Sequence, residues 1–125
     1  MEQEDKDLLL RDLCARLPYG VKCYKMTFKP ELAEEVICML RNGSHNCVQL
    51  GTFLYRLEHI KPYLFPLSSM TEEQKRDYQY ITERWMNDPT YTISDSFDWL
   101  HKNHFDYRGL IPKGLAIDAT GLNIY

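Results

Sequence analysis

The chain has 125 residues, of which 44% are hydrophobic and 26% are charged, and its net charge at pH 7 is −3. This length and composition are those of one globular domain, or of two subdomains that share one core, and they argue against a disordered chain. A net negative charge provides no general excess of cations for the phosphates of nucleic acid.

The N-terminal residues, MEQEDKD, lack the positive charge and apolar run of a signal peptide. No apolar stretch approaches the ~20 residues that a membrane helix needs. We therefore expect a cytoplasmic protein that has no membrane partner. The four cysteines form no CxxC pair, and we interpret them as buried free thiols rather than as disulfides or metal ligands. They are Cys14, Cys23, Cys38 and Cys47.

A first helix is expected from a cap at Asp5 or Asp7 to about Leu17, because Pro18 and Gly20 end the helical pattern. One face carries apolar residues at helical spacing, and the opposite face is expected to contact solvent. The apolar residues are Leu10, Leu13, Cys14 and Leu17. The polar residues are Arg11, Asp12 and Arg16.

The next segment predicts strands. Val21 and Cys23 alternate with polar neighbours, as in a half-buried strand. Asn-Gly at positions 42 and 43 favours a two-residue hairpin turn, so residues 36–40 and 46–50 are expected to pair antiparallel. The alternative is a helix over residues 30–43, with Pro30 at its start and Gly43 after its end.

Residues 53–60 are expected to form a further strand. Residues 62–69, PYLFPLSS, are expected to form an extended connector, since each proline biases the preceding residue toward extended backbone. The connector is apolar enough to lie over the core.

Two later helices are predicted. Thr71 and Gln74 form a capping box that opens the first of them, which ends before Pro89. Ser94 is expected to cap the second, which ends near residues 103–106. The tail, residues 114–125, alternates apolar and polar residues, and it is either a last edge strand or an arm on the surface.

The sequence therefore predicts an α+β fold. An N-terminal helix with a small antiparallel sheet, or a partly open barrel, forms residues 1–67. Two helices and a short tail strand form residues 68–125, and the two parts share one core in a single compact domain.

Three residues in the last predicted helix have the chemistry of a metal site. Asp98, His101 and His104 are spaced by three, so their side chains are neighbours on a helix. Two imidazoles and a carboxylate are ligands that zinc and non-haem iron accept. Successive steps of three also drift around the helix, and the alternative interpretation is that His101 and His104 are semi-buried or exposed histidines beside aromatic residues.

Aromatic residues are dense near the C-terminus, and Tyr and Trp are favoured at protein interfaces because they bury large areas at little cost in rotamer entropy. We expect a binding face that includes Trp99, Tyr107 and Arg108. The alternative is that these aromatic residues pack in the core.

Three stretches resemble one group of proteins: LLLRDLCARLPYGVK, HIKPYLFPLSSMTEEQK and DWLHKNHFDYRGLIPKGLAI. The group consists of short, uncharacterised proteins encoded in gut Bacteroidetes genomes and in their phages or mobile elements. The resemblance follows the same order over about half of the chain. It implies an origin and a cytosolic setting, and no activity, cofactor or site residue is transferred.

We therefore expect a non-enzymatic protein-interaction or accessory module without a cofactor, whose partner is another protein or a second copy of the chain. The main alternative is a nucleic-acid-binding accessory protein that uses basic residues on the predicted sheet. These residues are Lys22, Lys25, Arg56 and Lys61. A metal-dependent enzyme at Asp98, His101 and His104 is the third hypothesis.

Overall fold

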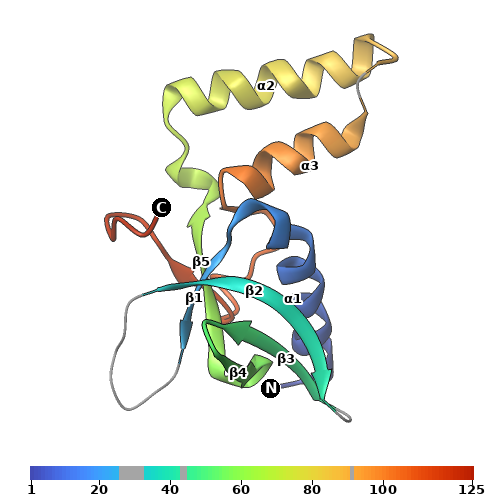
Figure 1. Cartoon of the computed structure of the whole chain (residues 1–125). Helices are drawn as coiled ribbons and strands as arrows, with labels where there is room; N and C mark the ends of the chain where they lie inside the picture. Colours follow the sequence, from blue (N-terminus) through green and yellow to red (C-terminus); the bar gives the residue numbers. More distant parts are fainter. Residues whose placement is uncertain (26–32, 43–44, 91) are drawn as a thin grey trace.

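The computed structural model describes residues 1–25, 33–42, 45–90 and 92–125. It has an α+β fold with an N-terminal helix, an open sheet and two later helices (Figure 1). The α-helices are α1 (Gln3–Arg16), α2 (Glu72–Asn87) and α3 (Ile93–Lys102). The strands are β1 (Lys22–Lys25), β2 (Glu34–Asn42), β3 (His45–Leu50), β4 (Phe53–Arg56), β5 (Ile60–Pro66), β6 (Phe105–Asp106) and β7 (Ile117–Asp118). Short 3-10 helices are η1 (Leu17–Tyr19), η2 (Leu57–His59) and η3 (Leu67–Ser69).

The strand order is β4-β3-β2-β1-β5-β6, and β7 also pairs with β5. The pairs from β4 to β5 are antiparallel, whereas β6 and β7 run parallel to β5. The predicted α+β class and the three predicted helices are confirmed, but the sheet is larger than predicted and contains parallel pairs. β5 joins the two halves of the chain because it pairs with β1 from the first half and with β6 and β7 from the second.

Helix α1 packs against the sheet through a different face from the predicted one. The helix begins at Gln3, so neither Asp5 nor Asp7 caps it. Leu13 is buried as expected, whereas Cys14 is exposed. α1 holds leucines at four positions, 8, 9, 10 and 13, so more than one apolar stripe fits the helical period. The buried residues of α1 are Leu9, Asp12, Leu13 and Arg16.

The predicted hairpin is confirmed, and the helix alternative is excluded, because β2 and β3 pair antiparallel. Gly43 and Ser44 of its turn lie outside the described residues. A bulge between Val36 and Cys38 adds one residue to β2. As a result Val36 and Met39 both face the core, although a regular strand would place them on opposite faces.

The predicted connector is largely a central strand. β4 ends at Arg56, and most of residues 62–69 belong to β5 and η3. A proline removes only its own N–H donor from a sheet. Its neighbours remain paired, since the Phe65 N–H donates to the His104 carbonyl at 2.8 Å and the Leu64 carbonyl accepts from the Ala119 N–H at 2.8 Å.

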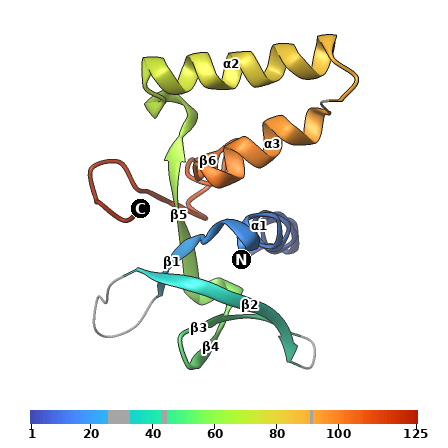
Figure 2. The same cartoon turned by 45° about the horizontal axis from the view of Figure 1, so that its top comes forward.

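Helices α2 and α3 form a hairpin, and α2 lies further from the sheet than α3 (Figures 1 and 2). The predicted capping box is confirmed, since Thr71 Oγ1 accepts from the Gln74 N–H and Gln74 Oε1 accepts from the Thr71 N–H. Helix α3 is capped by Thr92 rather than Ser94, because Asp95 reaches back to the Thr92 N–H at 2.7 Å. Of the α2 side chains that the structure describes, none is buried.

The tail forms the short strand β7 beside β5, as one of the two predicted alternatives. It ends at Tyr125, whose hydroxyl accepts from the Lys22 N–H and donates to the Tyr63 carbonyl, both at 2.8 Å. The last pair of the β1–β5 ladder on this side is Cys23 with Pro62. The phenol therefore joins the two strands at the position where their own pairing stops.

Candidate functional site

The predicted site residues lie around the end of α3, and three of them, His101, Tyr107 and Arg108, lie beside α1. His101 Nε2 and the Tyr107 hydroxyl are 2.6 Å apart. The Tyr107 ring lies between two guanidinium groups, with the Arg16 carbon 5.5 Å and the Arg108 carbon 5.0 Å from its centroid. Burial, and then the positive charge of Arg16, lowers the pKa of His101. The ring is therefore neutral at pH 7 and is held as part of the fold.

Three charged side chains, Asp12, Arg16 and Arg108, form a bonded group next to Tyr107. Arg16 Nε donates to Asp12 Oδ2 at 2.7 Å, and both side chains are fully buried. Arg108 Nε donates to the other carboxylate oxygen at 3.1 Å. Arg16 also donates through Nη2 to the carbonyl of Phe105. Both oxygens of Asp12 are thus paired, which offsets the cost of burying its charge, whereas the buried Arg16 Nη1 has no hydrogen-bond partner among the described residues.

The three predicted metal ligands diverge. Asp98 is exposed on α3, and His101 is turned toward Tyr107. His104 follows the end of the helix with φ 62°, and its ring stacks on Tyr125 with centroids 3.6 Å apart. Because α3 ends at Lys102, the helical spacing that would have aligned the three side chains stops before the third. In the part of the chain that the structure describes, no three His, Cys, Asp or Glu side chains form a metal-binding group.

The predicted binding residues do not share one face. Trp99 stacks on Phe105 with centroids 5.6 Å apart and planes 10° apart, and it also contacts Tyr78 of α2 at 5.4 Å. It therefore fastens the helical hairpin to the sheet. Tyr107 and Arg108 are engaged on the α1 side, and the Arg108 side chain is only 19% exposed. All three side chains are committed to contacts within the fold.

The four basic residues of the nucleic-acid hypothesis are also separated. Lys25 is buried and its ammonium lies 2.9 Å from Glu34. Lys22 donates to the Ile124 carbonyl at 2.9 Å. Arg56 is exposed on β4, and Lys61 lies on β5 opposite Tyr24. Lys22 and Lys25 thus bond to groups within the fold, and the four predicted basic residues do not form one basic face.

The apolar surface that sequence reasoning missed lies on β2, β3 and β4, on the face opposite α1. Cross-strand partners share a face of a sheet, and the register places Leu40, Cys47 and Arg56 in one row and Cys38, Gln49 and Leu54 in the next. The bulged residue Ile37 lies beside them. We call these seven residues the outer β face: Ile37, Cys38, Leu40, Cys47, Gln49, Leu54 and Arg56.

Three large apolar side chains of the outer β face are open to solvent. Ile37 is 56% exposed, Leu40 43% and Leu54 48%. The opposite face of the same strands holds Val48 and Leu50, which are fully buried. The bulge in β2 explains why this exposed surface was not predicted from the sequence. Without it, alternation from Val36 would place Cys38 and Leu40 on the buried side.

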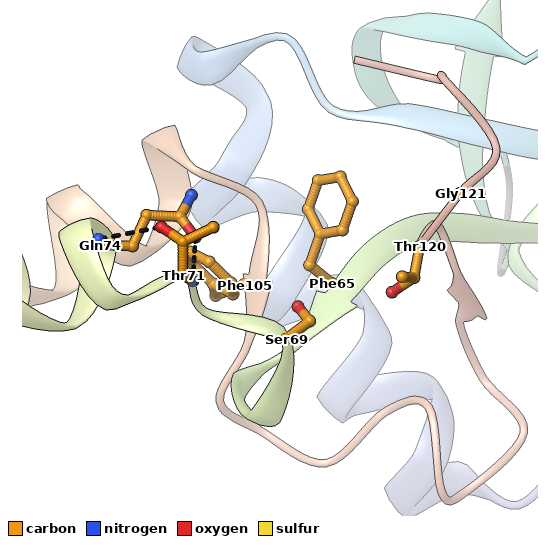
Figure 3. Close-up of a pocket in the computed structure, with 7 residues that line it drawn as sticks. All are labelled: Phe65, Ser69, Thr71, Gln74, Phe105, Thr120 and Gly121. Carbon is orange, nitrogen blue, oxygen red and sulfur yellow. Dashed lines mark hydrogen bonds between the residues drawn. The ribbon is translucent and has the colours of Figure 1, made fainter.

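A separate pocket lies at the base of the helical hairpin (Figure 3). Its volume is about 220 Å³. The end of β5, the entry to α2 and the C-terminal tail meet there. It is lined by Phe65, Ser69, Thr71, Gln74, Phe105, Thr120 and Gly121.

In comparisons with known proteins, no family model, no curated protein and no solved structure matches the chain. Among the described helices, none has both the length and the apolar character required to cross a membrane.

Proposed function

We propose that the chain is a non-enzymatic protein-interaction module that binds another protein through the outer β face. The observation that carries this proposal is the group of three exposed branched apolar side chains, Ile37, Leu40 and Leu54, on one face of a sheet. Contiguous apolar patches rimmed by polar groups are typical of protein–protein contact sites. Gln49 and Arg56 provide polar groups on the same face.

The energetics favour a partner with an apolar surface. Burying a Leu or Ile side chain that was exposed stabilises a complex by roughly 1.5–3 kcal/mol. The other face of these strands belongs to the hydrophobic core, and the exposed side chains of the outer β face take no part in that core. β4 is also the last strand in the described order, and no described strand covers its free edge.

The resemblance to proteins of gut Bacteroidetes, their phages and mobile elements suggests the setting. We propose a cytoplasmic accessory or regulatory role for the module in such an element. A nucleic-acid partner is the weaker proposal, because Lys22 and Lys25 are engaged inside the fold.

The test compares two aspartate variants of equally exposed leucines. Leu54→Asp places a charge on the outer β face, and Leu67→Asp places the same charge in η3, where Leu67 is 44% exposed. Tagged wild type and both variants are used for affinity capture from nuclease-treated lysate of the host cells, with mass spectrometry as the readout. We expect one near-stoichiometric protein with wild type and Leu67→Asp, and its loss with Leu54→Asp.

Two results would contradict the proposal. One is capture of the same proteins by all three baits, and the other is no enriched protein with any of them. Light scattering on the purified protein separates a second copy of the chain from a different partner. A wild-type dimer that Leu54→Asp converts to a monomer would identify the second copy as the occupant of the outer β face.

A further inference from the structure

The pocket at the base of the helical hairpin is formed by three chain segments that are distant in sequence. Phe65 is the residue before the last of β5, Gln74 lies in the first turn of α2, and Thr120 lies in the tail. Figure 3 shows their side chains arranged around one space. None of the lining residues belongs to the outer β face, so this pocket is a site of its own.

The apolar wall is made of aromatic rings that are held in place. The Phe65 and Phe105 centroids are 6.2 Å apart, with planes 56° apart. Phe105 stacks on Trp99, and Phe65 contacts Tyr125 with centroids 6.0 Å apart. Aromatic pairs are favourable at centroid distances of about 4.5–7 Å. A further ring packed against Phe65 would extend this series of aromatic contacts.

The polar wall offers both donors and acceptors. The capping box uses Thr71 Oγ1 and Gln74 Oε1 as acceptors, which leaves the Thr71 hydroxyl proton and the Gln74 Nε2 group to donate. Ser69 donates its hydroxyl to the Pro66 carbonyl at 2.6 Å, and Thr120 donates to Asp118 at 2.6 Å. Their oxygens therefore remain as acceptors.

The charge of the described lining residues and the volume of the pocket limit the class of ligand that it can bind. None of the described lining residues carries a formal charge, so the wall provides no cation to pair with an anion. A cavity of about 150 Å³ in another protein holds benzene. A volume of about 220 Å³ therefore accommodates one ring with a small substituent.

We propose that this pocket binds an uncharged aromatic ring that carries one group able both to donate and to accept a hydrogen bond, as a phenol does. The ring packs against Phe65, which the buried Phe105 supports from behind, and its hydroxyl bonds to the polar wall formed by Ser69, Thr71, Gln74 and Thr120. The same chemistry occurs in a tyrosine side chain of a partner protein and in a small phenolic molecule.

The test is an NMR titration of the full chain with p-cresol, with 4-methylcyclohexanol and toluene as matched probes. We expect p-cresol to cause saturable shifts of the residue 69, 74 and 120 amides. It should bind roughly five- to tenfold more tightly than the saturated alcohol, which lacks the ring, and about fivefold more tightly than toluene, which lacks the hydroxyl. The absence of saturable shifts at these amides, or equal binding of the three probes, would overturn the proposal.

A matched pair of variants locates the binding. Thr120 and Thr90 occupy the same local arrangement, since each donates its N–H and its hydroxyl to the aspartate two residues earlier. Both threonines are exposed, and only Thr120 lines the pocket. We expect Thr120→Phe to weaken p-cresol binding about tenfold or more, because its own ring occupies the space, and Thr90→Phe to leave it unchanged. Binding of p-cresol to Thr120→Phe as tightly as to wild type would overturn the proposal.

A last titration with N-acetyl-tyrosinamide identifies the source of the ring. Binding tighter than that of p-cresol supports a peptide-borne tyrosine, and weaker binding supports a free phenolic ligand. Both orders support a phenol pocket. These results do not depend on Leu54, so failure here and failure of the proposed function are observed separately.

Discussion

Two regions of the molecule invert the usual distribution of residues. At the junction of α1 with α3 and β6, Asp12 and Arg16 are fully buried. On the outer β face, at the other end of the fold, Leu40 and Leu54 are open to solvent. The first region thus buries charged side chains, and the second exposes apolar ones.

The difference between the regions is whether the inverted groups have partners. Both oxygens of Asp12 are bonded, one to Arg16 and the other to Arg108. The side chains of Ile37, Leu40 and Leu54 on the outer β face are exposed and lie outside the hydrophobic core. A buried charge with its partners is a structural feature, whereas an apolar surface without one indicates a binding surface.

Removing one member of the buried pair should be the most damaging change. Asp12→Ala leaves the Arg16 guanidinium buried without its carboxylate, and breaking such a pair costs about 3–5 kcal/mol. Urea unfolding at pH 7 measures the loss. Lys75→Ala is the control, because it removes the exposed pair with Glu72 and should cost less than about 0.5 kcal/mol. Similar small losses for both variants would show that the buried charges are not essential to the fold.

The second prediction concerns pH. Burial lowers the pKa of His104 to about 4, with Arg16 and Lys22 acting in the same direction. In the unfolded chain a histidine binds its proton near pH 6.5, so below that pH the unfolded state holds more protons than the folded state. Stability should therefore fall, on the order of 2–3 kcal/mol from this residue, as the pH decreases from about 6.5 to about 4.

His104→Asn isolates this contribution, because asparagine tolerates the positive φ of 62° at this position. Urea unfolding of both proteins at pH 7 and pH 4.5 gives the comparison. The variant should lose less stability than wild type between the two pH values. An equal loss would mean that His104 is protonated as readily in the folded state as in the unfolded chain.

A smaller effect is expected at the tail. Tyr125→Phe removes the hydroxyl that links the Lys22 N–H to the Tyr63 carbonyl, and we expect a loss of about 1 kcal/mol. Thermal unfolding measures it. Tyr80→Phe is the matched control, since Tyr80 is exposed on α2, and no change is expected there. A shift in Tm for the control as large as that for Tyr125→Phe would argue against the tail contact.

The local elements could be predicted where one signal decides the structure. The capping box at Thr71 and the β2–β3 hairpin needed only residues close in sequence. Strand β5 could not be predicted, because Pro62 and Pro66 suggest a connector. Its formation depends on pairing with β1, β6 and β7, which come from distant parts of the chain.

The candidate sites were harder to predict than the elements. Residues 98–108 were predicted to hold a binding face or a metal site, whereas the contacts described there are internal, because Tyr107 and Arg108 contact Arg16 and Asp12 about 90 residues earlier. The outer β face was not predicted because one bulge in β2 changes which side chains face solvent. Neither a long-range ion pair nor a one-residue register shift leaves a periodic signal in the sequence.

The most direct test of this account measures stability and binding on the same Leu54→Asp preparation. If the outer β face serves binding, the free energy of unfolding should change by no more than about 0.5 kcal/mol, while the captured partner is lost. If Leu54 instead stabilises the fold, the variant should lose about 2 kcal/mol or more. That loss of stability, or retention of the partner at wild-type levels, would contradict the account.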